Sequence, residues 1–206
     1  MRNIYRGKTV VVTGHTGFKG AWLTMWLKKL GANVIGISNK VLTKPSIYES
    51  ANINKDINDI RLDITDYKKL HNILSKSKPD IIFHLAAQAL VGESYKDPYK
   101  TMQTNGVGTM NIVESLRDLN QKVTAVIITS DKVYDNVEWL WGYKETDQIG
   151  GKDPYSASKG LAELVLKSYY HSFFSQSSSK VKIAIARAGN VIGGGDWSEN
   201  RIVPDC

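Results

Sequence analysis

The sequence contains a single cysteine and no long hydrophobic run. Cys206 is the last of 206 residues, so neither an internal disulfide nor a cluster of thiolate metal ligands can form. Nowhere do about 18 apolar residues follow one another, as a membrane-spanning helix requires, and the N-terminal stretch is polar before its first apolar run. We therefore expect a cytoplasmic protein without a membrane partner or a metal site, in which any redox chemistry depends on a bound cofactor.

Clusters of charge of one sign are also missing. The formal net charge is +7, with 27 lysines and arginines against 20 acidic residues, but the lysines are scattered along the chain. A scattered basic excess predicts a solvated surface that tolerates anionic ligands such as nucleotides, and it does not predict a nucleic-acid partner. The hydrophobic fraction of 42% is enough for one globular domain with a substantial core.

Short apolar runs rich in β-branched residues recur along the chain and predict strands. The runs are Thr9–Thr13, Val34–Ile37, Ile81–Leu85, Val123–Thr129 and Val181–Ala186, with a weaker one at Ile57–Leu62. Helical patterns separate them. This alternation predicts an α/β fold, a Rossmann-like doubly wound sheet of about six parallel strands with helices on both faces.

Two of the helices can be outlined from the spacing of their apolar residues. The first follows Gly20, ends near Gly31, and is expected to carry one apolar face made of Trp22, Leu23, Trp26, Leu27 and Leu30. The second begins at about Asp66 and is expected to turn inward Tyr67, Leu70, Ile73 and Leu74. The serine-rich stretch SFFSQSSSK, residues 172–180, predicts a surface loop before the last strand.

A glycine-rich segment joins the first predicted strand to the first predicted helix. Gly14 permits a tight turn, Gly17 lets the backbone approach a pyrophosphate, and Gly20 allows the helix to pack closely on the strand. The spacing is GxxGxxG, and the strand before it and the helix after it favour a dinucleotide site over an ordinary turn. The second strand lacks a terminal acidic residue for the ribose of NAD, and Lys40 could accept a 2′-phosphate, so NAD and NADP both remain open.

Two further segments bring together groups suited to proton transfer. Asp153 can cap a helix and Pro154 suits its first turn, which places Tyr155 and Lys159 one turn apart on the same face. An ammonium near a phenol stabilises the phenolate, so the tyrosine can act as a base near neutral pH. The stretch ITSDKVYD adds a hydroxyl, a carboxylate and an amine in Ser130-Asp131-Lys132, where the fourth strong apolar run ends. Together these parts predict a hydride-transfer site.

Six motifs resemble the extended short-chain dehydrogenase/reductase family, and within it most closely the CDP-glucose 4,6-dehydratases. They are, in chain order, TGHTGFKG, HLAAQALV, TNGVGTMNIVE, TSDKVYDN, PYSASK and RAGNVIGGGDW. The resemblance extends from about Gly7 to the C-terminus. It implies NAD as cofactor, a nucleotide-diphosphate sugar as substrate, a role in deoxysugar biosynthesis for lipopolysaccharide O-antigen, and assembly as a homodimer or homotetramer.

The resemblance also implies a set of cofactor and substrate contacts. Those implied for the cofactor are Gly14, Thr16, Gly17, Phe18, Lys19, Gly20, Asp63, Ile64, Leu85, Ala86, Ala87, Gln88, Asn105, Tyr155 and Lys159. Those implied for the substrate are Ser94, Asn190 and Arg201. Asp63 and Asn105 also have simpler interpretations, because an aspartate often ends a strand in a turn and a buried amide needs partners in any case. Trp139 and Trp141 are expected to pack a flap near the pocket without a catalytic role.

The implied reaction assigns a role to each catalytic residue. The sugar is oxidised at C4, water is eliminated across C5 and C6, and the same hydride returns to C6. Tyr155 would take the proton of the 4-hydroxyl, with Lys159 tuning it, while Ser130 would hydrogen-bond the same oxygen. Asp131 would protonate the departing 6-hydroxyl, and Lys132 stands where related dehydratases carry the glutamate that removes the C5 proton.

The family continues past the positions that match Pro204 and Asp205 into a segment that completes the nucleotide-sugar pocket. We therefore expect residues 1–206 to be the NAD-binding Rossmann domain, truncated before that segment. Two alternatives remain. A nucleotide-sugar epimerase shares the glycines and the Tyr155/Lys159 pair but does not need Asp131 and Lys132. A catalytically impaired NAD-binding fragment would not need Ser130, Tyr155 and Lys159 intact.

Overall fold

The computed structural model describes residues 4–200 and 205–206, and it contains one six-stranded, wholly parallel sheet. The strands are β1 (Thr9–Thr13), β2 (Asn33–Ser38), β3 (Asn58–Arg61), β4 (Ile81–His84), β5 (Val123–Ile128) and β6 (Val181–Ala186). Their order across the sheet is β3-β2-β1-β4-β5-β6. The predicted doubly wound sheet is confirmed, and each predicted strand agrees with the observed one to within one residue at either end.

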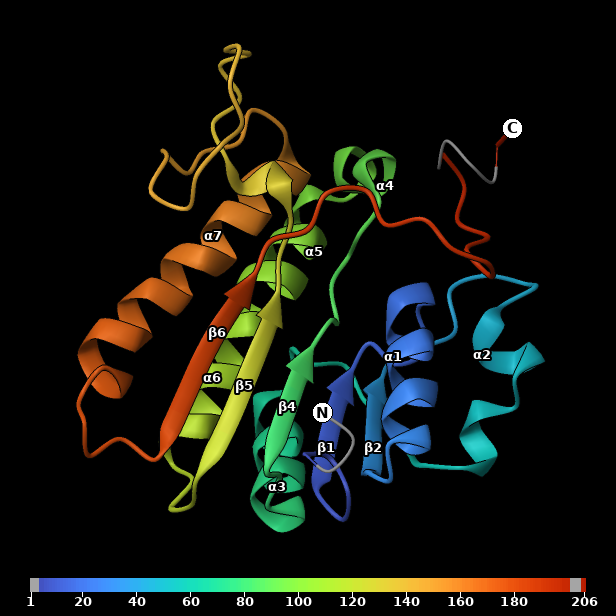
Figure 1. Ribbon diagram of the computed structural model, residues 1–206. Helices are drawn as coiled ribbons and strands as arrows, with labels where there is room; N and C mark the ends of the chain where they lie inside the picture. Colours follow the sequence, from blue (N-terminus) through green and yellow to red (C-terminus); the bar gives the residue numbers. More distant parts are fainter. Residues whose placement is uncertain (1–3, 201–204) are drawn as a thin grey trace.

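Helices lie on both faces of the sheet, as predicted (Figure 1). The main ones are α1 (Phe18–Lys29), α3 (Tyr67–Ser77), α6 (Gly108–Arg117) and α7 (Pro154–Tyr169). Shorter helices are α2 (Ile47–Ser50), α4 (Val91–Lys96), α5 (Pro98–Met102), 3₁₀ turns at Ile53–Lys55 and Asp131–Val133, and π-helical turns at Gln103–Val107 and Tyr170–Phe174. Within the described residues, no helix combines the length and the apolar character needed to cross a lipid bilayer.

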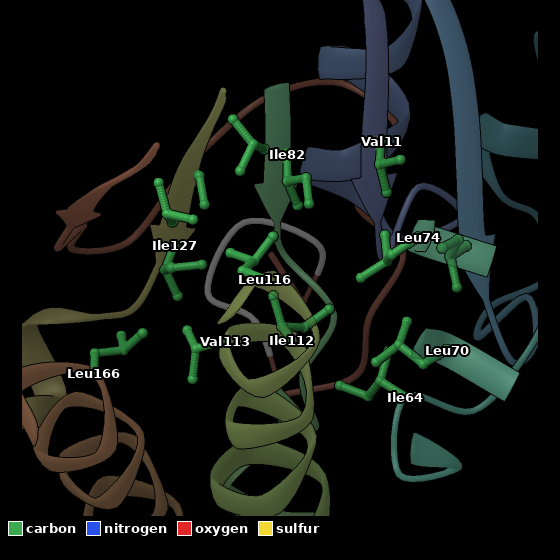
Figure 2. Close-up of a cluster of buried hydrophobic side chains, with 14 of the residues drawn as sticks. Val11, Ile64, Leu70, Leu74, Ile82, Ile112, Val113, Leu116, Ile127 and Leu166 are labelled. Atoms are coloured by element: carbon green, nitrogen blue, oxygen red, sulfur yellow. The ribbon is translucent and has the colours of Figure 1, made fainter. Parts of the chain in front are cut away.

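The larger hydrophobic core lies between the sheet and helices α3, α6 and α7 (Figure 2). Ile82 and Ile127 from the sheet meet Leu70 of α3, Leu116 of α6 and Leu166 of α7, and all five side chains are buried. A smaller core on the opposite face packs α1 against β1 and β2. Burying these apolar surfaces contributes about 25 cal/mol per Å², so the α3, α6 and α7 layer anchors most of the sheet.

The smaller core does not extend over the far strands of the sheet. Along β5 the side chains alternate, with Val123 and Ala125 buried and Thr124 exposed between them, and on β6 Lys182 and Ala184 are exposed as well. This alternation is typical of a strand with one solvated face. The helices on the second face therefore cover β1 and β2, where the glycine-rich segment begins.

One expectation about side-chain burial is wrong, and one about a surface loop is only partly right. Helix α1 does not turn its tryptophans inward: Trp22 is 50% exposed and Trp26 64% exposed, while Ala21, Thr24 and Leu27 are buried. The tight contact of α1 with the glycine-rich loop selects small side chains for the packed face, so the large rings lie outside it. The surface loop expected at 172–180 is also only partly present, because residues 172–174 extend α7 in a π-helical turn that buries Phe174.

The close approach of α1 to the loop predicts that a side chain at Gly20 lowers stability. A Cβ atom at Gly20 would lie 2.1 Å from the carbonyl oxygen of Gly14, whereas a Cβ at Gly92, in α4, would meet nothing within 4 Å. We expect Gly20→Ala to lower the free energy of unfolding by about 2 kcal/mol or more. Gly92→Ala should raise it by about 0.5–1 kcal/mol, as alanine usually does in a helix. Urea unfolding measures both changes, and a Gly20→Ala protein as stable as the wild type would contradict the packing described here.

Candidate active site

A cleft of about 770 Å³ lies at the carboxyl ends of the strands. Its walls come from segments far apart in the chain: the start of α1, the loop after β4, helix α4, the end of β5, the first turns of α7 and the segment after β6. That last segment, red in Figure 1, runs from β6 across the sheet edge towards α1. It is fastened there because Trp22 Nε1 donates to the carbonyl of Gly194, 2.8 Å away.

The glycine-rich loop turns tightly at the end of β1. Gly14 has a φ of +76°, and a Cβ there would come within 2.7 Å of the Ala86 backbone nitrogen. The Gly17 N–H donates to the Gly14 carbonyl at 3.1 Å, and α1 begins at the next residue, Phe18. Only glycine adopts this left-handed conformation without strain while another backbone approaches so closely. The loop therefore brings the N-terminus of α1 to the cleft.

The first turn of α1 is suited to an anion. No side chain caps its N-terminus, and the turn carries no acidic residue. Phe18 and Lys19 line the cleft, so the uncapped backbone donors lie beside a basic side chain. Unsatisfied N–H groups and the helix dipole favour phosphate at such a position. These residues thus fit the pyrophosphate of a dinucleotide.

The ends of β2 and β3 lie next to the same loop. Thr16 Oγ1 donates to the carbonyl of Lys40 at 2.7 Å, which ties the glycine-rich loop to the end of β2. Asp63 accepts hydrogen bonds from the backbone and hydroxyl of Thr65 and from Asn39. Burial opposes ionisation of Asp63, but these bonds outweigh it and the pKa of its carboxyl lies below the usual value. Ile64 is buried in the larger core.

The loop after β4 forms one wall of the cleft. Leu85 and Ala87 line it, and the Ala86 N–H donates to the Thr13 hydroxyl at 3.1 Å. The backbone N–H and carbonyl of Gln88 both hydrogen-bond the buried side-chain amide of Asn105. The side chain of Gln88 hydrogen-bonds the Leu90 backbone and the Thr101 hydroxyl. Asn105 also donates to the Ser158 hydroxyl on α7 at 2.7 Å. Asn105 and Gln88 thereby join the wall to α7.

The end of β5 presents the three adjacent polar groups to the cleft. Ser130 Oγ donates to Asp131 Oδ1 at 3.0 Å and accepts the Lys132 N–H at 3.2 Å, which caps the following 3₁₀ turn. The Lys132 ammonium bonds the other oxygen of Asp131 at 3.0 Å. Asp131 and Lys132 therefore form a half-exposed ion pair.

The first turns of α7 bring Tyr155 and Lys159 to the same cleft. Asp153 caps the helix by accepting the Ser156 N–H at 3.0 Å, and Pro154 occupies the first position, as the sequence predicts. The Lys159 ammonium lies 5.8 Å from the centre of the Tyr155 ring. Lys159 is only 7% exposed, and burial, together with the charge of Lys19, lowers its pKa to about 8.

His84, at the end of β4, lies beneath this arrangement. Its ring nitrogens bond the hydroxyls of Thr13 and Thr109, at 2.7 and 3.2 Å, and the side chain is buried. Burial and the nearby charge of Lys159 lower the pKa of His84 to about 3, so the ring is neutral at physiological pH. A neutral ring at this point adds no second charge beside the buried lysine.

The residues expected to bind substrate lie in different environments. Asn190 lines the cleft. Ser94 is buried, its hydroxyl donates to the Val91 carbonyl at 2.7 Å, and it does not line the cleft. Arg201 lies outside the described residues. The rings of Trp139 and Trp141 pack on each other, with centres 5.3 Å apart, in the connection between β5 and α7, and neither residue lines the cleft.

Sequence reasoning missed two residues that adjoin the site. Glu163 is 2% exposed and accepts two hydrogen bonds from Arg187 Nε, at 2.8 and 3.0 Å, and one from Arg187 Nη2. Glu163 follows Lys159 by four residues, so the helical spacing places it on the same stripe of α7 as Tyr155. That spacing was an available signal. No local sequence pattern predicts that Glu163 pairs with Arg187, which follows β6.

Comparisons with known proteins agree on the family and the fold. The family model described as GDP-mannose 4,6 dehydratase matches residues 11–182. A CDP-glucose 4,6-dehydratase of Salmonella typhimurium is 47% identical over 99% of this chain and 58% of its own length. A dTDP-D-glucose 4,6-dehydratase of Dictyostelium discoideum is 30% identical, over 95% of this chain and 46% of its own length. The solved structure of an epimerase from Methanothermobacter thermautotrophicus superposes with a TM-score of 0.81 at 32% identity, over 98% of this chain and 57% of its own.

The buried lysine makes a prediction about stability and pH. The pKa of Lys159 is about 8 in the folded protein and 10.5 ordinarily, so its burial lowers the free energy of unfolding. This loss has its full size below pH 8. We expect Lys159→Met to raise the free energy of unfolding at about pH 7 by about 2–3 kcal/mol. The gain should shrink between pH 8 and pH 10.5, because there the wild-type folded protein releases a proton that the unfolded chain keeps.

Chemical denaturation at several pH values measures this difference. Lys167→Met, which removes an exposed lysine from the same helix, serves as the matched control and should leave stability nearly unchanged. A Lys159→Met protein that is less stable than the wild type at neutral pH would contradict the description of Lys159 as a cation whose burial destabilises the fold.

Proposed function

Because the chain belongs to the family that the GDP-mannose 4,6 dehydratase model describes, we propose that it forms the cofactor-binding domain of a nucleotide-sugar 4,6-dehydratase. The proposed substrate is CDP-glucose and the product CDP-4-keto-6-deoxyglucose. The observation that carries the proposal is one cleft lined by the groups for oxidation, Tyr155 and Lys159, and those for elimination, Asp131 and Lys132. The 47% identity to the Salmonella enzyme supports CDP-glucose, although the chain spans just 58% of the length of that relative.

NAD is the proposed cofactor, and it supplies a hydride acceptor for C4 and a donor for C6. The first turn of α1 would hold its pyrophosphate and the loop after β4 its adenosine side. The phenolate form of Tyr155 would accept the proton of the 4-hydroxyl, and the Lys159 ammonium would stabilise this phenolate before it is protonated. Ser130, which also lines the cleft, would hydrogen-bond the oxygen at C4 as it becomes a carbonyl.

Elimination of water needs a base at C5 and an acid at the C6 oxygen, and we assign both to the ion pair of Asp131 and Lys132. If the proton between them moves from the ammonium to the carboxylate along their 3.0 Å bond, both groups become neutral. The amine then removes the C5 proton and the carboxylic acid protonates the departing hydroxide. Loss of water around a pair favours its neutral form, so substrate that covers the half-exposed pair would promote this exchange.

The remaining assignments belong to the whole protein. We propose that it is cytoplasmic and that it forms a homodimer or homotetramer. Exposed apolar side chains on the outer helices, including Tyr99 of α5 and Leu164 of α7, support the last of these. The exposed side chain of Lys40 leaves room for NADP as an alternative cofactor.

A first test removes the proposed base from the protein that carries this domain. Tyr155→Phe deletes the phenol oxygen and keeps the ring, so CDP-glucose oxidation and keto-sugar formation should fall together, by a factor of about 100 or more. Tyr170→Phe, at the end of the same helix, is the matched control and should retain full turnover. Nuclear magnetic resonance detects the keto product, and near-normal turnover by Tyr155→Phe would overturn the assignment.

A second test separates oxidation from elimination. Lys132→Ala removes the proposed C5 base and leaves Tyr155 in place, so C4 oxidation should continue while water loss stops. Mixing enzyme and CDP-glucose in a single turnover should then give a lasting near-ultraviolet absorbance of reduced nicotinamide without the keto-deoxy product. If the variant forms product at the wild-type rate, Lys132 is not the base.

A further inference from the structure

The ion pair between the buried Glu163 and the partly buried Arg187 is not explained by the proposed chemistry. Neither residue lines the cleft. Glu163 lies on α7, two turns beyond Tyr155 and one beyond Lys159, and Arg187 follows the last residue of β6. Their bonds raise the pKa of Arg187 above its already high ordinary value, so the guanidinium stays charged. A buried pair of this kind is weak evidence for a stabilising role, because removing both charges from water costs about as much as their attraction returns.

The pair also holds the strand end that carries the polar triplet. Thr129 Oγ1 donates to Glu163 Oε1 at 2.7 Å, and Thr129 directly precedes Ser130. The backbone on either side of Arg187 holds the same segment, because the Ala186 carbonyl accepts the Thr129 N–H and the Ala188 carbonyl accepts the Asp131 N–H, both at 3.0 Å. The end of β5 is therefore held by Glu163 through a side chain and by β6 through the backbone.

Arg187 extends the connection to the segment between β5 and α7. Its guanidinium lies 4.7 Å from the centre of the Tyr134 ring, and Nη1 donates to the Glu145 carbonyl at 3.4 Å. One side chain thus touches the helix with the oxidising groups, the segment that follows the eliminating groups, and the loop between them. Another Glu–Arg pair, Glu114 and Arg117, connects neighbouring turns of α6 and touches the far end of α7 through Tyr169 and Phe173, away from the cleft.

We propose that Glu163 and Arg187 are positioning residues, which set the separation of Ser130 and Asp131 on β5 from Tyr155 and Lys159 on α7. The inference rests on the proposed function. Tyr155 and Asp131 act on different carbons of one sugar, so both must hold their places while the sugar stays bound. A displacement of about 1 Å between catalytic groups can cost about 100-fold in rate. A planar guanidinium with two parallel bonds to a carboxylate fixes direction as well as distance.

The kinetic test compares matched variants in the full protein. Glu163→Gln keeps the shape of the side chain and weakens its bonds to Arg187, and Glu114→Gln makes the same change in the pair on α6. For Glu163→Gln we expect kcat to fall about 100-fold, with KM for CDP-glucose and the dissociation constant of NAD changed less than about threefold. Glu114→Gln should match the wild type. A Glu163→Gln enzyme that loses only thermal stability and keeps its kcat would overturn the proposal.

Thr129→Val keeps the inference testable if Glu163→Gln fails to fold. It removes only the hydroxyl link to Glu163 and leaves the ion pair intact, and we expect kcat to fall about tenfold. Thr101→Val is not a suitable control, because the Thr101 hydroxyl accepts a hydrogen bond from Gln88 at the cleft wall. Thr124→Val, on the solvated face of β5, is suitable and should keep full activity. Wild-type kcat in Thr129→Val would contradict the proposal.

A measurement without substrate separates this inference from the proposed function. In Glu163→Gln, but not in Glu114→Gln, amide hydrogen exchange should become faster in both segments 129–133 and 155–159, because the connection between them is weakened. Unchanged exchange in either segment would refute the positioning role. If the wild-type protein does not convert CDP-glucose, the proposed function fails while the exchange result still decides the inference.

Discussion

Strand order reverses beside β1: β2 and β3 lie on one side of it, and β4, β5 and β6 lie on the other. Because all six strands are parallel, each following loop emerges at the same edge of the sheet, and at the reversal the loops after β1 and β4 lead in opposite directions. The resulting gap cannot be filled by either connection. The cleft, the uncapped start of α1 and the polar end of β5 all lie at this edge, so the location of the candidate site follows from topology.

The buried charge at the cleft lowers the free energy of unfolding. Lys159 is buried beside a second lysine and above a histidine that stays neutral, and none of these groups supplies it with a negative charge. A site that binds an anionic dinucleotide can compensate for such a charge only when the ligand is present. Under the proposed function, the dinucleotide would restore this stability when it binds, which is a common relation between function and stability at active sites.

Features with local signals could be predicted from the sequence, and those set by distant contacts could not. β-Branched runs predicted all six strands, and Asp153 with Pro154 predicted the start of α7, because capping involves neighbouring residues alone. The predicted buried face of α1 was wrong, because apolar residues occur around most of the helix while only a narrow face of mostly small residues is packed. The buried hydroxyl of Ser94 depends on a short helix whose orientation no local pattern determines. The pairing of Glu163 with Arg187 joins residues 24 positions apart on two elements, so only the fold brings them together.

The central claim is that residues 4–200 already form the phosphate-binding half of a dinucleotide site at the start of α1. Isothermal titration calorimetry of NAD and NADP against the folded protein, in the absence of any sugar nucleotide, tests it most directly. The account predicts saturable binding of one NAD per chain, with the binding weakened by inorganic pyrophosphate because both ligands use the same backbone donors. Well-folded protein that gives no binding heat with either dinucleotide at several temperatures would contradict it.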